Sequence, residues 1–320
     1  MHRSSSLDNP DIELPGPWAH RYVSANGARF HICESRPEQA SASAPLVVLL
    51  HGFPEFWWAW RHQLPVLAAA GYHAVAMDLR GYGASDKTPR GYDPLTLASD
   101  VTGVIRSIGS RSAVIVGQGW GGYVGWTAAA QRPDCVSALC AVGAPHPLAL
   151  TNVRGRWLLP TRPVRHVLAM QIPWLPERRI ARGSYVAQHL AAWAAAGSSF
   201  PSPDEAARYR AAFALWPSPH CALEYHRWLF RSRLRADGRA FTRVLRRKVA
   251  VPVAHISGAE DPAEPTGSTL ASARHVTGAF VHHSIAGAGH FPHEESPQEF
   301  NRVLLSWLSL GATTGGHADG

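Results

Sequence analysis

The feature that most constrains the fold is a regular alternation of short apolar runs with helical segments. The apolar runs lie at 46–50, 73–77, 113–116 and 136–142, and helical patterns lie around 61–70, 95–108 and 122–131. Continuous apolar runs of this length fit strands that are covered on both faces, and the helical stretches supply the crossovers between them. The sequence therefore predicts a doubly wound α/β fold with a mostly parallel, eight-stranded sheet.

The alternation is interrupted once and then resumes. Two short runs, 21–23 and 29–33, flank Ala25-Asn26-Gly27, and Asn-Gly favours the tight turn of a hairpin. From 147 to 248 the chain is rich in Arg, Ala and Trp and is broken by prolines, whereas further strands are expected at 251–257 and 279–284, before a helix at 297–310. We expect a core over 18–146 and 249–310, a helical lid over 147–248, a flexible arm over 1–17 and a disordered tail over 311–320.

The charge is unevenly distributed along the chain. The formal net charge is +8, but residues 152–248 alone hold 18 basic and five acidic residues. This excess indicates either an anionic ligand, membrane surface or acidic partner, or the composition of a GC-rich genome. No nucleic-acid-binding motif accompanies it. The opening residues lack the apolar stretch of a secretory signal, and no apolar run is long enough to span a bilayer, so we expect a soluble, cytoplasmic protein. The four cysteines show no metal-ligand spacing, so we expect no metal.

Four motifs carry the chemistry. HGFPEFWWAWRHQ (51–63) follows the run at 46–50, where a glycine-tight turn can direct a backbone N–H at charge that develops on a substrate. The others are DLRGYGASD (78–86), VGQGWGG (116–122) and GAGHFPHE (287–294). In these strings, and in their order from about Trp18 to Leu310, the chain resembles the epoxide hydrolases of the α/β-hydrolase fold.

The resemblance implies a role for individual residues. Phe53 and Trp120 would supply the oxyanion-hole N–H groups, and His290 would be the general base that activates water. Asp261, in SGAEDP (257–262), would orient His290, and its neighbour Glu260 is the weaker candidate. The resemblance and the Trp-rich run also imply an apolar pocket; besides Phe53 and Trp120, its expected residues are His51, Pro54, Trp57, Tyr225 and His226.

The chain departs from the family at the nucleophile. Epoxide hydrolases and haloalkane dehalogenases carry an aspartate at the turn after the strand expected at 113–116, a turn called the nucleophile elbow. Esterases carry a serine there. In this chain the position holds Gly119. Glycine cannot form an ester or acyl intermediate, and neither Gln118 nor Trp120 replaces it. The elbow is a strained turn, so glycine relieves backbone strain of roughly 1–3 kcal/mol while it removes covalent chemistry.

The lid also departs from the family, whose epoxide hydrolases use two lid tyrosines to hold the epoxide oxygen. In LEYHRW (223–228) the alignment puts His226 at one tyrosine, with Tyr225 one residue earlier. No tyrosine lies in MQIPW (170–174), where the other is expected, so Tyr185 is a further candidate. His226 is either a proton donor or a packing residue.

Three functions remain open from the sequence. The first is a hydrolase that needs no cofactor, in which water activated by His290 attacks a small apolar epoxide or ester directly. The second is a catalytically inactive protein that binds a small molecule in the same pocket. The third is a lyase or isomerase that uses His290 as its base. The sequence sets neither the substrate nor the oligomeric state.

Overall fold

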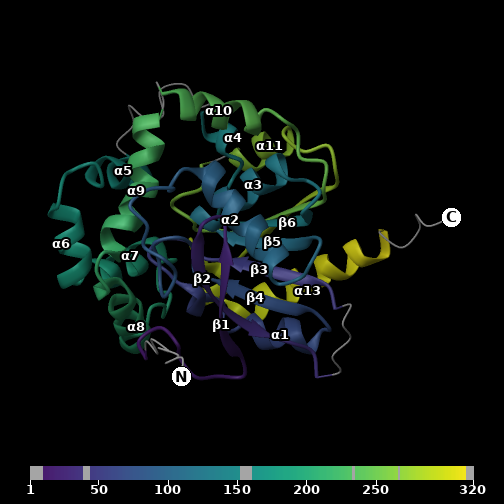
Figure 1. Cartoon of the computed structure of the whole chain (residues 1–320), viewed down its shortest axis with the longest axis horizontal. Helices are drawn as coiled ribbons and strands as arrows, with labels where there is room; N and C mark the ends of the chain where they lie inside the picture. The colour runs from purple at the N-terminus through teal and green to yellow at the C-terminus, as the bar shows by residue number, and fades with distance from the viewer. Residues whose placement is uncertain (1–9, 39–43, 152–160, 233–234, 266, 315–320) are drawn as a thin grey trace, which may run out of the picture.

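A single twisted sheet runs through the centre of the molecule (Figure 1). The structure is a computed structural model that describes residues 10–38, 44–151, 161–232, 235–265 and 267–314. Its strands are β1 (Ala19–Ala25), β2 (Ala28–Ser35), β3 (Leu46–Leu50), β4 (His73–Met77), β5 (Ala113–Gln118), β6 (Val136–Val142), β7 (Val253–Gly258) and β8 (Phe280–Ile285). They form one eight-stranded sheet in the order β1-β2-β4-β3-β5-β6-β7-β8. β2 runs antiparallel to both of its neighbours, and the other pairs are parallel, which confirms the predicted fold class.

The strands form where the sequence predicts them, for identifiable local reasons. Every residue of β3 and β4 is buried, as their uninterrupted apolar runs require. Asn26 and Gly27 have φ values of 45° and 73°, which is the left-handed backbone of a two-residue hairpin turn between β1 and β2.

The core helices lie between successive strands and at the end of the chain. They are the 3-10 helix η1 (Trp57–Trp60), α1 (Leu64–Ala69), α2 (Pro94–Ser107), α3 (Trp120–Gln131), α11 (Ser268–Ala273), α12 (Pro292–Glu295) and α13 (Pro297–Thr314). α2 begins where the Asp93 side chain accepts a hydrogen bond from the Thr96 N–H at 3.0 Å. α13 continues through Thr314, beyond the helix end expected at Leu310.

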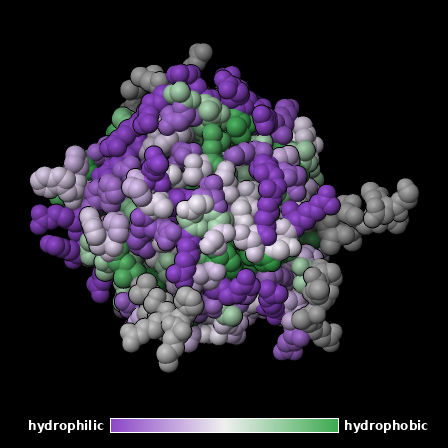
Figure 2. All heavy atoms as spheres, in the orientation of Figure 1, coloured by the Kyte–Doolittle hydropathy of each residue, from purple (hydrophilic) through white to green (hydrophobic). Residues whose placement is uncertain are grey.

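The segment expected to form a lid is helical between β6 and β7. It contains α4 (Pro147–Thr151), α5 (Arg162–Ala169), α6 (Leu175–Arg182), α7 (Tyr185–Trp193), α8 (Pro203–Ala214), α9 (Ser218–Arg231) and α10 (Ala236–Leu245). In Figure 1, α5 to α9 lie together at the left of the sheet and α10 crosses above it. Hydrophilic residues dominate the face seen in Figure 2, where hydrophobic ones appear only in small scattered groups. None of the described helices is both long and apolar enough to cross a membrane.

Part of the expected flexible arm is packed against the core instead. Ile12 is fully buried, and its carbonyl accepts the indole N–H of Trp57 at 2.8 Å. The Leu14 carbonyl accepts the indole N–H of Trp18 at 2.9 Å. The prediction of a loose segment was therefore wrong for residues 10–17; residues 1–9, and 315–320 of the expected tail, lie outside the described part of the chain.

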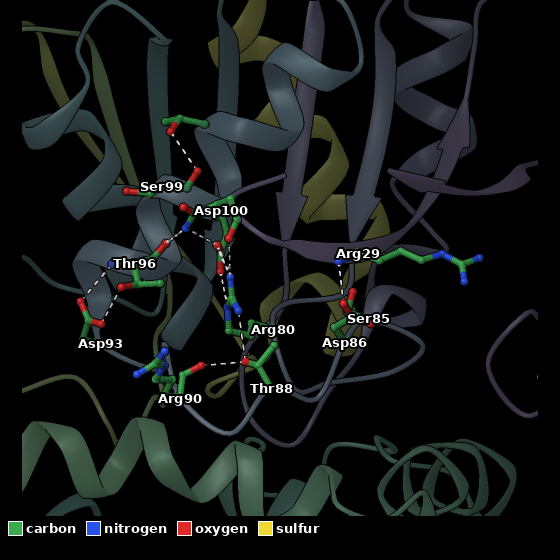
Figure 3. Close-up of polar contacts among 12 residues, drawn as sticks. Arg29, Arg80, Ser85, Asp86, Thr88, Arg90, Asp93, Thr96, Ser99 and Asp100 are labelled. Atoms are coloured by element: carbon green, nitrogen blue, oxygen red, sulfur yellow. Dashed lines mark hydrogen bonds and ion pairs between the residues drawn. The ribbon is translucent and has the colours of Figure 1, made fainter. Parts of the chain in front are cut away.

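A buried ion pair fixes the loop that follows β4. The Arg80 guanidinium donates to both carboxylate oxygens of Asp100 on α2, at 2.8 and 2.6 Å, and to the hydroxyl of Thr88 at 3.1 Å. Figure 3 shows these groups pointing toward one another between α2 and the loop. Both side chains of the pair are at least 95% buried, so the pair holds this loop beside the lid helices.

Candidate active site

The elbow after β5 is a strained turn that only glycine enters easily. β5 ends at Gln118, α3 begins at Trp120, and Gly119 between them has φ 50° and ψ −112°. A Cβ on Gly119 lies 3.4 Å from Nε2 of His290 and 3.8 Å from the Cα of Gly52, which are ordinary contact distances. The backbone therefore disfavours a side chain at this position, whereas the space around it does not.

His290 faces this glycine and is held by a carboxylate from behind. Its Nδ1 lies 2.9 Å from Oδ2 of Asp261, whose other oxygen accepts the Ala263 N–H at 2.7 Å. His290 follows β8 in the chain. Its backbone N–H donates to the Trp193 carbonyl at 2.9 Å. The histidine and the acid are 8% and 9% exposed.

The environment keeps His290 basic. Burial alone lowers the pKa of its imidazole, but the charge of Asp261 and the hydrogen bond to it outweigh burial and raise the pKa above its ordinary value. A carboxylate on Nδ1 keeps the proton on that nitrogen in the neutral ring. Nε2, the nitrogen that faces Gly119, is then the one able to accept a proton.

Two backbone N–H groups flank the elbow. Phe53 follows the turn after β3 and Trp120 is the first residue of α3, and neither N–H has a hydrogen-bond acceptor among the described residues. The turn is held by the buried carboxylate of Glu55, which accepts the Gly52 N–H at 3.2 Å. From the other side, the Gln118 amide donates to the His290 carbonyl at 2.9 Å. The arrangement suits a negatively charged oxygen next to the elbow.

Histidines of the lid form a hydrogen-bonded chain above the elbow. The indole N–H of Trp120 can only donate, so Nε2 of His226, at 3.1 Å, accepts, and the proton of His226 lies on Nδ1, 3.2 Å from the Ala222 carbonyl. Nε2 of His166 lies 3.0 Å from the same Nε2 of His226, so its N–H shares that single lone pair with the Trp120 indole. Nδ1 of His166 accepts the hydroxyl of Tyr185 at 3.2 Å.

Burial keeps these lid histidines neutral. It lowers the pKa of His226 to about 4 and that of His166 well below its ordinary value. His189, with its ring 4.8 Å from that of His166, is shifted in the same direction and also mainly by burial. Each of the three rings lies against the Phe53 side chain, at centroid distances of 5.0 to 5.6 Å. The wall opposite the elbow is therefore aromatic and uncharged near neutral pH.

A cavity of about 370 Å³ joins these groups between the core and the lid. Gly119, Phe53, Trp120 and His290 line one end, beside His226. The lining away from the elbow is mainly aliphatic and aromatic, and includes Leu148, Val164, Val167, Leu229, Phe241 and Leu245. Apolar walls around a few polar groups are typical of a small-molecule site.

Four of the residues expected in the pocket do not line this cavity. Trp57 is fully buried in the core, where its indole donates to the Ile12 carbonyl, and Pro54 is buried beneath the turn. His51 is engaged at both ring nitrogens, at 2.8 Å from the Gly52 carbonyl and 3.1 Å from the Leu79 N–H. These placements correct the prediction: the side chains of Trp57 and His51 bond backbone groups, Pro54 is buried, and none of the three lines the cavity.

Tyr225 is the fourth of these residues. Its hydroxyl donates to the Arg80 carbonyl at 2.7 Å, and its ring lies against Tyr82, 5.4 Å away between centroids. It therefore anchors α9 to the core loop and presents no hydroxyl to the cavity. Tyr185 does not line the cavity: its hydroxyl bonds His166, and its ring lies 5.9 Å from that of His189 between centroids.

Sequence reasoning did not find His166, His189 or Trp193, all of which line the cavity. His189 and Trp193 are four residues apart on α7, so they share one face of the helix, and their rings stack at 4.9 Å. That spacing is a usable signal. Nothing comparable marks His166, whose role depends on how α5 packs against α9.

One group of described residues has the spacing of a metal site, His62, Glu205 and Glu294, and it does not fit an ion. The Arg61 guanidinium donates to Glu294 at 2.7 Å and to Glu205 at 2.6 Å. The two carboxylates therefore already share a cation. Burial, and to a smaller extent the charge of Arg61, lower the pKa of His62 to about 4.

Comparison with known proteins places this architecture. The sequence model described as the alpha/beta hydrolase family matches residues 47–303, which include the elbow and His290. The chain belongs to the alpha/beta hydrolase family. Within it, the chain is epoxide-hydrolase-like, as its motifs predicted, because several of the relatives that it matches carry that name.

Three relatives illustrate the match. The AB hydrolase superfamily protein YfhM of Bacillus subtilis is 30% identical over 298 residues, covering 90% of this chain and 97% of the relative. Epoxide hydrolase A of Mycobacterium tuberculosis is 31% identical over 333 residues, covering 92% and 98%. The solved structure of an epoxide hydrolase from an endophytic Streptomyces has a TM-score of 0.75 and 28% identity, covering 92% of this alpha/beta hydrolase and 96% of that chain.

Proposed function

We propose that this alpha/beta hydrolase hydrolyses a small apolar epoxide or ester without forming a covalent intermediate on the protein. The observation that carries the proposal is the position of His290. Its Nε2 lies 3.4 Å from the position that a Cβ on Gly119 would take, while Asp261 binds its Nδ1. A water bound at that position would be within reach of this nitrogen, in the volume that a nucleophilic side chain takes up in relatives of the fold.

In the proposed reaction, Nε2 of His290 takes a proton from the water as its oxygen bonds to the substrate carbon. Asp261 stabilises the imidazolium that forms. With an ester, the carbonyl oxygen becomes negative and accepts the N–H groups of Phe53 and Trp120. The tetrahedral species then collapses, and the leaving alkoxide takes the proton back from His290.

The lid favours the ester over the epoxide. Displacement at an epoxide carbon places the leaving oxygen opposite the attacking water, on the side away from His290. There the proton of His166 is directed to His226, and that of His226 to the Ala222 carbonyl, so neither is directed at a substrate. An epoxide must therefore take its proton from solvent, or the lid hydrogen bonds must rearrange.

The cavity sets the expected substrate class. Its lining away from the elbow is mainly aliphatic and aromatic, and its lid histidines His166 and His226 are neutral. Arg239 is the one residue with a permanent charge among those that line it, and its side chain is exposed. A volume of about 370 Å³ suits a molecule of modest size. We infer an uncharged substrate with an apolar group pointing toward Phe241 and Leu245.

The experiment is a single-turnover measurement in ¹⁸O-labelled water with panels of apolar esters and epoxides. Direct attack puts the label into the product in the first turnover, and His290→Gln lowers the rate by about 10²–10⁴-fold. With an epoxide, a covalent route through a protein carboxylate instead leaves the first product unlabelled, and that result refutes the proposal. With an ester, a covalent acyl-enzyme also releases labelled acid, so the refuting result is an acyl adduct on the acid-quenched protein, detected by mass spectrometry. Saturable binding with no turnover by the wild type points to a binding protein, and a product that has gained no water points to a lyase or isomerase.

A further inference from the structure

The side-chain position of Gly119 is bounded by groups that suit a small anion. A Cβ there meets only Nε2 of His290 and the Cα of Gly52 within 4 Å, and the position opens onto the cavity. It therefore has room for a few atoms beyond the backbone. We propose that the elbow binds a small monovalent anion such as azide or formate, and that the bound anion opens an epoxide ring in place of the nucleophile that the chain lacks.

Three hydrogen-bond donors belong to residues next to this position. The backbone N–H groups of Phe53 and Trp120 have no acceptor among the described residues, and Trp120 begins α3, a helix of 12 residues whose N-terminus carries a partial positive charge. His290 is 8% exposed, and no described residue contributes a hydrogen-bond partner to its Nε2. In the protonated ring this nitrogen is a charged donor.

The carboxylates near the elbow are already engaged. Asp261 lies on the far side of the imidazole, bound to Nδ1. Glu55 is fully buried behind the turn, where it accepts the Gly52 N–H and lies 3.3 Å from the ring of His293. Glu295, whose charge also acts on His290, accepts the N–H groups of Gly289 and Phe291. Each of these three carboxylates therefore already has a hydrogen-bonded partner.

The size of the site limits the anion. An ion of three heavy atoms is small compared with the cavity of about 370 Å³, and leaves the far end of the cavity free for the epoxide. An aromatic carboxylate extends much farther and competes with the substrate for the same space. We therefore expect azide and formate to act, and benzoate to inhibit.

The reaction balances without any further redox partner. With azide, a terminal nitrogen bonds to an epoxide carbon, the ring C–O bond breaks, and the alkoxide takes a proton from solvent water to give an azido alcohol. With formate, an oxygen attacks in the same way and gives a hydroxyalkyl formate ester. Water activated by His290 then attacks the formyl carbon, which releases a diol and returns the formate.

The formate cycle needs the ester-hydrolysing step of the proposed function, but the azide reaction does not. Azide also replaces water as the nucleophile, so it needs no general base. The azido alcohol is a product that hydrolysis cannot form. Azide is therefore the probe that separates this inference from the proposed function.

The test incubates the full-length wild type with styrene oxide and sodium azide, and measures azido alcohol and diol by chiral chromatography and mass spectrometry. We expect azido alcohol at least tenfold above the enzyme-free rate, with one enantiomer in excess and saturation in azide. Benzoate should compete. An azido alcohol rate equal to the enzyme-free rate overturns the inference, whether or not diol is formed. Azido alcohol without direct hydrolysis leaves it standing and overturns the water mechanism.

Gly119→Ala and Gly109→Ala form a matched pair of variants. Both put a methyl group on a backbone with positive φ, 50° and 93°, but Gly109 lies at the end of α2, with no atom within 4 Å of its Cβ and no part in the cavity. Gly119→Ala should lose most of the azido alcohol, and Gly109→Ala should retain it. Equal loss in both variants overturns the assignment of the anion to the elbow. If Gly119→Ala does not fold, the infrared band of azide bound to the wild type gives the same answer, because benzoate must abolish it.

Discussion

Replacing Gly119 with asparagine or aspartate tests the elbow directly, because the two side chains have the same shape and only one carries a nucleophile. The added Cβ lies 3.4 Å from Nε2 of His290 and 3.8 Å from the Cα of Gly52, so steric overlap adds little. The remaining term is the backbone, which has φ 50° and ψ −112°. A non-glycine residue held in such a region costs roughly 1–3 kcal/mol.

The unfolding free energy should therefore be highest for the wild type, lower for the aspartate variant and lowest for the asparagine variant. Gly119→Asn should lose about 1–3 kcal/mol of unfolding free energy in urea denaturation. Gly119→Asp should lose less than the asparagine variant, because its carboxylate gains a charge-assisted hydrogen bond to His290. An asparagine variant as stable as the wild type would refute the assignment of strain to this turn.

Chemistry should separate the same two variants. Gly119→Asp places a carboxylate at the elbow. When its reaction with an epoxide is quenched with acid, an ester should remain on residue 119, visible as an increase in protein mass equal to the mass of the epoxide. Gly119→Asn and the wild type should show none. An adduct on any wild-type carboxylate near the elbow would show that the chain has a covalent nucleophile although position 119 is glycine. A folded aspartate variant that binds epoxide without forming an adduct would show that His290 and the oxyanion donors are not in working positions.

Three further predictions concern the base, the lid and the core. The pKa of His290 is raised above its ordinary value of 6.5, and only the neutral ring accepts a proton from water. The hydrolysis rate should therefore rise with pH and reach half its maximum above pH 6.5. A rate that falls with pH over this range contradicts the role of His290 as the base. His226→Phe removes the acceptor that two partly buried N–H groups share and should cost about 1–3 kcal/mol in urea denaturation, whereas His226→Gln, which keeps an acceptor, should cost less. Arg80→Met leaves Asp100 buried without its cation and should cost about 3–5 kcal/mol, whereas Arg302→Met, on the surface, should leave the denaturation midpoint unchanged.

The sequence predicted the sheet well because local patterns determine it. The runs at 46–50 and 73–77 are strands with those same bounds, and the Asn26-Gly27 turn joins β1 to β2. A buried parallel strand must be apolar on both faces, and a two-residue hairpin turn must accept positive φ. Both requirements appear in the sequence within a few residues, so they can be read without knowing the rest of the fold.

The lining of the pocket could not be predicted in the same way. Trp57 belongs to a Trp-rich string, yet the 3-10 turn of η1 directs its indole to the Ile12 carbonyl in the core. Ile12 and Leu14 are two aliphatic residues among acidic residues and prolines, too few to form a pattern that marks them as buried. His166 and His226 are 60 residues apart and meet only because α5 packs against α9. Tertiary packing decides each of these placements, and it leaves no local signal.

The positions of the acid and base do not depend on the residue at the elbow. His290 is positioned by its N–H bond to the Trp193 carbonyl, by the amide of Gln118 on its own carbonyl and by Asp261 on its ring. None of these contacts involves a side chain at position 119. A glycine there consequently leaves His290, Asp261 and the N–H groups of Phe53 and Trp120 in place. In the proposed function and in the proposed reaction with azide, the attacking atom therefore arrives from solution, as water or as a small anion.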